Sequence, residues 1–156
     1  MKQKAKTLIE KLGFSDPDHK SSKHDEIQLW VYNNVEEVLR SLSNGDKVFD
    51  IKMKSLEYPI SQTSANYKSI VGFVDLYVSG TIASSIGSEV NRFDASIEIK
   101  SDIQCCGDLI RQIKFYKQFE VTRSTWIVVS PDDRFESILR EQWIYFFKYK
   151  DPAILL

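Results

Sequence analysis

One segment of the chain, Ser69–Val78, is apolar on both faces of an extended strand. Because successive side chains of a strand point to opposite faces, Asp75 and Val74 lie on different faces, each among apolar neighbours. A strand of this kind needs cover on both sides, which places it inside a sheet rather than at its edge. Asp75 is the one charged side chain on its face of the strand. Burying an ionised carboxylate costs several kcal/mol unless a cation or hydrogen bonds compensate.

The remaining periodicities predict a mixed α/β (α+β) fold, an antiparallel meander followed by a crossover unit. The expected helices are Lys2–Leu12, Asp25–Leu42 with Gly45 closing it, Asp108–Phe119 and Asp132–Gln142, and the other expected strands are Lys47–Leu56, Phe93–Ser101, Trp126–Ser130 and Trp143–Tyr149. The chain of 156 residues suits a single domain over 1–156, with a core at about 25–149.

Composition excludes several classes of protein. The chain is 42% hydrophobic, which excludes disorder, and 28% charged without a long apolar run, which argues against a membrane span. Its 21 Lys+Arg against 22 Asp+Glu, a net charge of −1, argue against a surface basic all over but allow a local basic groove. The chain is therefore expected to have no membrane partner.

The cysteines and histidines indicate no metal cluster of their own. Cys105 and Cys106 are adjacent, and two cysteines cannot form a four-thiolate site within one chain. The Lys-rich stretch Met1–Gly13 is not typical of a secretory signal, which predicts a cytoplasmic setting. His19 and His24 stand in a polar, loop-like stretch and are expected at the surface, which argues against a Ser-His-Asp triad.

A second strand brings two more ionisable groups to Asp75. In Phe93–Ser101, Glu98 and Lys100 share one face, opposite Ala95, Ile97 and Ile99. If this strand pairs antiparallel with Ser69–Val78, two carboxylates and a lysine meet on one patch of sheet. Neighbouring carboxylates repel unless a cation lies between them, and oxygen ligands suit magnesium or manganese. An ion pair on a solvated face is the alternative.

The helix expected over Asp108–Phe119 carries polar side chains on its apolar face. Gln112 and Tyr116, at i and i+4, share an arc with Leu109, Ile113 and Phe119. A tyrosine there can be core, but a buried glutamine must find hydrogen-bond partners. Arg111, Lys114 and Lys117 lie on the other side of the helix.

Together these motifs resemble the PD-(D/E)XK nuclease superfamily and its RecB-like, Holliday-junction-resolvase-like pattern. The match consists of Asp75 in G-F-V-D, then E-I-K at Glu98–Lys100, then Q-x-x-x-Y from Gln112 to Tyr116, over roughly Asp25 to Ser130. The resemblance implies a restriction-endonuclease-like core, with a mixed sheet in αβββαβ order flanked by helices. Val74 replaces the proline of the family name, and the long connection after Asp75 predicts an extended hairpin from Ser79 to Asp94.

The resemblance also implies roles for these residues. Asp75, Glu98 and the main-chain carbonyl of Ile99 would bind Mg²⁺, for which Mn²⁺ could substitute. Lys100 would polarise the attacking water or stabilise the pentacovalent phosphate, and Gln112 and Tyr116 would orient the lysine, the strand or the scissile phosphate. Such families often add an acidic residue from the first core helix, for which Glu37 and Asn34 are the nearest positions. The implied activity is magnesium-dependent hydrolysis of DNA, by an endonuclease or an exonuclease.

DNA is the expected partner, and a basic patch offers it phosphate contacts. The patch comprises Arg111, Lys114, Lys117 and Arg123, with Lys52, Lys54 and Lys68 as possible additions. The aromatic segment Trp143–Tyr149 could stack on bases, although core or subunit packing is the simpler interpretation. A homodimer or higher homo-oligomer is expected, so that two sites can cut two strands. Sequence preference is expected to lie in loops at Ile60–Lys68 and Gly80–Asn91.

Two other hypotheses stay open. The chain could be a catalytically silent nuclease-fold module that binds DNA or a protein, as its near-neutral charge and missing proline would allow. It could also be a structural α/β protein whose acidic residues form only ion pairs.

Overall fold

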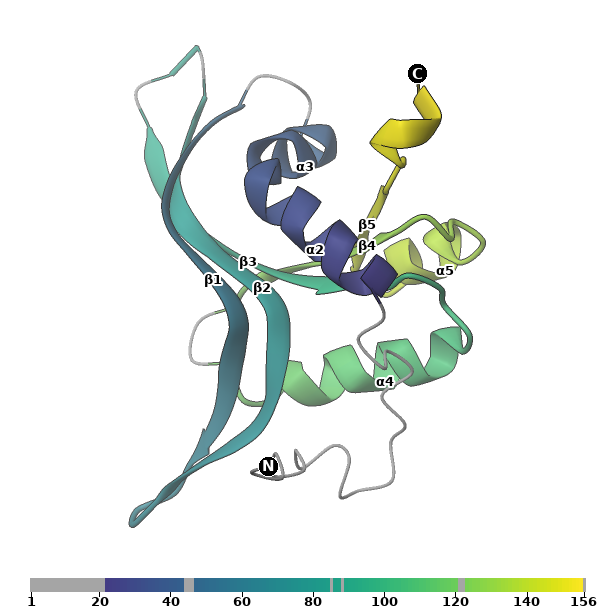
Figure 1. The fold of residues 1–156 in the computed structure, drawn as a ribbon. Helices are drawn as coiled ribbons and strands as arrows, with labels where there is room; N and C mark the ends of the chain where they lie inside the picture. The colour runs from purple at the N-terminus through teal and green to yellow at the C-terminus, as the bar shows by residue number, and fades with distance from the viewer. Residues whose placement is uncertain (1–21, 44–46, 85, 88, 121–122, 156) are drawn as a thin grey trace.

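The computed structural model describes residues 22–43, 47–84, 86–87, 89–120 and 123–155, which form a mixed α/β structure (Figure 1). The predicted helix Lys2–Leu12 and His19 lie outside these residues. In chain order the elements are α2 (Ser22–Asn33), α3 (Val35–Leu42), β1 (Lys47–Thr63), β2 (Lys68–Ser84), β3 (Val90–Ile99), α4 (Cys106–Lys117), β4 (Thr125–Ser130), α5 (Glu136–Glu141), β5 (Tyr145–Lys148) and the 3₁₀ helix η1 (Pro152–Leu155).

The five strands form one mixed sheet in the order β1-β2-β3-β4-β5. The first three strands are antiparallel to one another, and β4 and β5 continue the sheet parallel to β3. β2 therefore has a neighbour on each side, which confirms the interior position predicted from its two apolar faces.

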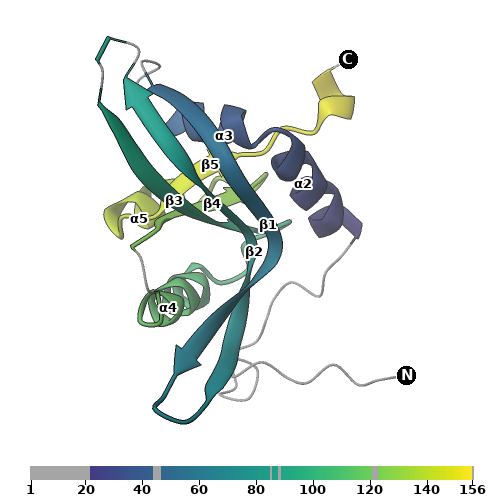
Figure 2. The ribbon, with the colours of Figure 1, turned by 90° about the vertical axis from the view of Figure 1, so that its left-hand side faces the viewer.

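β1 and β2 form a hairpin much longer than predicted. They pair from Lys47↔Ser84 to Thr63↔Lys68, and their far half bends away from the sheet and projects past α4 (Figures 1 and 2). We call this projecting half, residues 58–73, the arm. The expected loops at Ile60–Lys68 and Gly80–Asn91 are shorter than predicted, because β1 continues to Thr63, β2 runs from Lys68 to Ser84, and β3 begins at Val90. β2 and β3 pair out to Ala83↔Val90, which confirms the extended hairpin.

Helices cover both faces of the sheet (Figure 2). α2 and α3 pack on one face through Ile27, Val31, Val35 and Val38, against Leu76, Ile97 and Val129 among others. α4 and α5 pack on the opposite face through Leu109, Ile113, Tyr116 and Leu139, against Trp126 and Val128. This two-sided burial accounts for the short apolar run of β4.

Two predicted helices are divided or shortened by polar side chains. The helix expected over Asp25–Leu42 is two helices that meet at Asn34, whose side-chain amide donates to the Trp30 carbonyl at 2.8 Å. The helix expected from Asp132 begins only at Glu136. Asp132 accepts hydrogen bonds from Arg134 and from the main chain of Ile103. The residues between Asp132 and the start of α5 therefore form a turn instead of the first part of the helix.

None of the helices in the described ranges combines the length and the apolar character that a membrane crossing requires.

Candidate active site

The predicted catalytic row, which consists of Asp75, Glu98 and Lys100, lies where β2 and β3 separate. Their ladder ends at Leu76↔Ile97, and the next residues of the two strands are Asp75 and Glu98. Lys100 follows β3, and its main-chain N–H donates to the Val129 carbonyl at 3.0 Å. The side chains of Asp75, Glu98 and Lys100 are nearly inaccessible, with residue exposures of 8%, 1% and 2%. The structure therefore brings the three residues together and buries them.

Internal partners hold Asp75. Its Oδ2 accepts a hydrogen bond from the Ile99 main-chain N–H at 2.8 Å, and His24 Nε2 lies 3.4 Å from the same oxygen. Burial alone would raise the pKa of Asp75, but His24, Lys100 and the Ile99 N–H together hold this pKa below its usual range. These contacts therefore favour the ionised form of Asp75 against the effect of its burial.

Lys100 and Glu98 form the second half of the row. Lys100 Nζ lies 3.9 Å from Glu98 Oε2, and both side chains are at most 3% exposed. The ammonium group also lies near enough to Asp75 to lower its pKa. One buried cation therefore faces two buried carboxylates, an arrangement that lowers the cost of burying each charge.

His24 is a residue that the sequence analysis placed wrongly. It belongs to α2 and is 1% exposed, whereas a surface loop was expected. The signal was present: α2 begins one turn earlier than predicted, so His24 precedes Ile27 and Val31 on the buried face of the helix.

Gln28, one turn after His24, also contacts the site. Its Nε2 donates to the Asp75 main-chain carbonyl at 2.9 Å and to Glu57 Oε1 at 3.3 Å. Glu57 lies in β1 with a φ of 50°, a backbone conformation that costs a non-glycine residue about 1 kcal/mol or more. α2 therefore secures the strand that carries Asp75 as well as the carboxylate itself.

The further acidic residue expected from the first core helix is not at the row. Glu37 is exposed on α3, and Asn34 is engaged with Trp30. The contacts that a helix makes with Asp75 come instead from His24 and Gln28 of α2.

Tyr116 packs as the helical wheel predicts. It is 4% exposed and stacks on Trp126, with ring centroids 6.0 Å apart. Its ring fills the space beside Gly72, where an added Cβ would lie 2.3 Å from Tyr116 Cε1. The G-F-V-D motif and the Q-x-x-x-Y motif therefore contact each other through Gly72 and Tyr116. Gln112 is half-buried and hydrogen-bonds to no other described residue through its side chain.

The predicted basic residues divide into two groups. Arg111 pairs with Asp108 one turn earlier on α4. Lys114, Lys117 and Arg123 lie within electrostatic reach of one another: burial lowers the pKa of Lys117 most, Arg123 and Lys114 lower it further, and Glu120 opposes them. Of the possible additions, Lys54 donates to the Tyr32 carbonyl at 2.9 Å, Lys52 pairs with Asp50 at 2.5 Å, and Lys68 is exposed on the arm.

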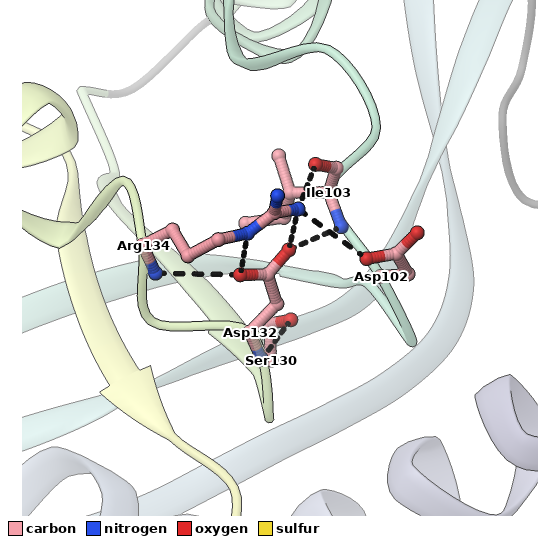
Figure 3. A network of polar contacts seen from close by, with 5 residues as sticks. All are labelled: Asp102, Ile103, Ser130, Asp132 and Arg134. Atoms are coloured by element: carbon pink, nitrogen blue, oxygen red, sulfur yellow. Dashed lines mark hydrogen bonds and ion pairs between the residues drawn. The ribbon is translucent and has the colours of Figure 1, made fainter.

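A polar network fixes the segment that follows Lys100 (Figure 3). Asp132 accepts two hydrogen bonds from the Arg134 guanidinium, at 2.7 and 2.8 Å, and one from the Ile103 N–H at 3.1 Å. Arg134 also donates to the Ile103 carbonyl at 3.2 Å and pairs with Asp102 at 3.7 Å. The turn after β4 thereby holds the turn that leads from β3 to α4.

Within the described residues, no group of three or more His, Cys, Asp or Glu side chains is arranged to hold a metal ion. Asp75 is turned toward Ile99 and His24, and Glu98 toward Lys100. Comparison of the chain with protein-family models, with curated proteins and with solved structures gives no match. The resemblance to the PD-(D/E)XK superfamily therefore stays a prediction.

Proposed function

We propose that the chain is a magnesium-dependent deoxyribonuclease with a restriction-endonuclease-like core. The observation that carries the proposal is the buried constellation of His24, Asp75, Glu98 and Lys100. Four ionisable side chains at one point of a core are costly to bury, and such clusters concentrate at functional sites. The strand order and the interlocked Gly72 and Tyr116 support the same interpretation.

The donor chemistry of the site fits a hard divalent cation. Asp75 and Glu98 offer carboxylate oxygens, which Mg²⁺ prefers, and His24 stays the partner of Asp75. The two carboxylates and the Ile99 carbonyl would hold the ion, for which Asp75 would have to turn from the Ile99 N–H and Glu98 from Lys100. When bound, the ion would supply a nucleophilic hydroxide at neutral pH and neutralise charge on the phosphate.

Lys100 has the role that follows most directly from its surroundings. Its ammonium group lies 3.9 Å from Glu98 Oε2, within electrostatic reach of Asp75, and is excluded from water, so it is held near the row before substrate binds. A hydrogen bond from Nζ to a phosphate oxygen would strengthen as negative charge develops there, which accelerates the reaction rather than only binding the substrate. Tyr116 would position α4 against β2 through Gly72, and Gln112 would orient the scissile phosphate.

One observation favours the alternative, a catalytically silent module. The row is at most 8% exposed, and its carboxylates are engaged with protein groups. Such a module would retain the fold and its basic patch for binding DNA or a protein. DNA and a second copy of the chain remain predicted partners under the nuclease proposal.

The test is a substrate panel. The chain and its Asp75→Asn variant are incubated with plasmid, linear and four-way-junction DNA, with Mg²⁺, with Mn²⁺ and with EDTA. We expect cleavage by the unmodified chain with Mg²⁺ only or with either metal ion, and none by the variant or in EDTA. The exposed-site variant Asp50→Asn serves as the matched control. DNA binding without turnover under every condition would favour the silent module.

A further inference from the structure

A cavity of about 180 Å³ lies between the arm and the segment that follows α4. Residues of the arm, of β2 and β3, and three residues that follow α4 line it; those that the argument uses are Tyr58, Tyr77, Ser96, Phe119, Glu120 and Ser124. None of His24, Asp75, Glu98 or Lys100 lines this cavity. It is therefore a separate feature from the proposed catalytic row.

Aromatic rings form one side of the cavity. Tyr58 and Tyr77 stack with centroids 4.3 Å apart and an interplanar angle of 18°. The Tyr77 hydroxyl donates to Asp94 Oδ1 at 2.6 Å, which fixes the orientation of its ring. Phe119 contributes a further ring to the lining. Flat ligands of aromatic character pack well against such rings.

Polar side chains held by hydrogen bonds also line the cavity. Glu120 Oε1 accepts a hydrogen bond from Trp126 Nε1 at 2.7 Å and another from the Ser124 hydroxyl. The Ser124 and Ser96 hydroxyls are themselves 2.8 Å apart. Both hydrogen bonds to Glu120 end on its Oε1. A ligand that presents N–H donors from a flat ring would complement these polar side chains.

The cavity lies beside the catalytic row, because one of its lining residues, Ser96, is close to Glu98 on β3. Ser96 precedes Glu98 by two residues on β3, so the two side chains share a face of the sheet about 6.7 Å apart along the strand. One nucleotide unit spans such a distance. Lys68 lines the cavity, and Lys117 lies within electrostatic reach of Glu120 and Arg123, so cations near the cavity offer phosphate contacts.

We propose that this cavity receives a nucleobase, unstacked from its neighbours, whose nucleotide adjoins the phosphodiester bound at Asp75, Glu98 and Lys100. The inference rests on the proposed function and specifies its substrate class: DNA that is single-stranded, or frayed, at the point of cleavage. A base can enter such a cavity only after leaving the duplex stack, which is least costly where the strand is already unpaired.

The test measures binding in EDTA, so that it does not depend on cleavage. Short single-stranded oligonucleotides are compared with the same sequence in duplex form and with copies that carry one abasic nucleotide at successive positions. We expect tighter binding of the single strand, and one abasic position that weakens binding by about tenfold, as the loss of one stacked base should.

Tyr58→Leu removes one ring of the cavity, and Tyr67→Leu, at the exposed tip of the arm, is the matched control. Tyr58→Leu should weaken single-strand binding by about tenfold, and the critical abasic position should then cost little more, because both changes remove the same contact. If Tyr58→Leu fails to fold, the abasic series on the unmodified chain decides. Equal affinities along that series would overturn the proposal, whereas a position-specific loss without any cleavage would overturn only the nuclease assignment.

Discussion

His24 Nε2 lies 3.4 Å from Asp75 Oδ2 in the interior of the protein, and both residues are more than nine-tenths buried. α2 supplies the imidazole and β2 the carboxylate, so this contact joins a helical layer to the sheet at the point where β2 and β3 separate. The pair links the stability of the fold to the charge state of the proposed catalytic row.

Replacing His24 with alanine should destabilise the protein and disturb the row. Asp75 would stay buried but lose a partner that stabilises its ionised form, so the pKa of Asp75 should rise. A buried polar group that loses its partner costs about 1–3 kcal/mol. Urea unfolding at pH 7 measures this loss, with Leu29→Ala, 60% exposed on the same helix, as the control. Equal stability of the two variants would show that the contact contributes nothing.

Gly72→Ala should also be strongly destabilising. The new methyl group would lie 2.3–2.6 Å from three atoms of Tyr116, so the tyrosine or the arm has to move, at a cost of roughly 1–3 kcal/mol. Gly87→Ala is the matched control, because the nearest heavy atom to its Cβ is 3.8 Å away. Thermal unfolding compares the two. Adding Tyr116→Leu should recover part of the loss in Gly72→Ala, and strict additivity of the two changes would contradict the interlock.

The Asp132 network predicts a dependence of stability on pH. Hydrogen bonds from Arg134, more than any other cause, hold the pKa of Asp132 well below its usual range. The unfolded chain therefore binds more protons in acid than the folded chain, and stability is lost as the pH falls from the ordinary carboxyl range toward the folded pKa. Asp132→Asn should be less stable than the unmodified chain at pH 7, and this difference should shrink in acid.

Asp133→Asn provides the comparison for Asp132→Asn. Asp133 forms an exposed ion pair with Lys148 and makes no contact with the Ile103 main chain, so its loss should change stability little. Urea unfolding of both variants from pH 7 down to pH 3 measures the effect. A constant difference between Asp132→Asn and the unmodified chain over that range would contradict the assignment.

Trp143 offers a stabilising substitution. It follows the last turn of α5 with a φ of 61°, the left-handed conformation that favours glycine, and it is 83% exposed. The Ile144 N–H donates to the Leu139 carbonyl around it, as in a glycine-terminated helix. Trp143→Gly should therefore raise the free energy of unfolding by about 1 kcal/mol. Trp143→Ala keeps the strained Cβ and should not match this gain in thermal unfolding experiments.

Much of the fold could be predicted from the sequence, because the spacing of apolar residues indicates the type of each element and the face that it buries. The two apolar faces of Ser69–Val78 located an interior strand, and period 2 placed Glu98 and Lys100 on one face beside Asp75. The spacing of Gln112 and Tyr116 located the face of α4 that meets the sheet, although only Tyr116 is fully buried.

What could not be predicted depends on contacts between distant segments. His24 stands in a polar stretch, and although it shares the buried face of α2 with Ile27 and Val31, its partner Asp75 lies far along the chain. Asp132 resembles the start of a helix, but Arg134 and the Ile103 N–H bind it in a turn. The arm resembles a loop because its outer residues are polar, and pairing between β1 and β2 keeps it extended.

The most direct test of the proposed nuclease activity is the rate of DNA cleavage by the Lys100→Ala variant with Mg²⁺, relative to the unmodified chain. Circular dichroism and thermal unfolding first establish that the variant is folded, and Lys150→Ala, exposed near the C-terminus, is the control. Loss of an oriented cation at a developing negative charge should slow cleavage by about 100-fold or more, while Lys150→Ala cleaves normally. Cleavage by folded Lys100→Ala at the unmodified rate would contradict the account.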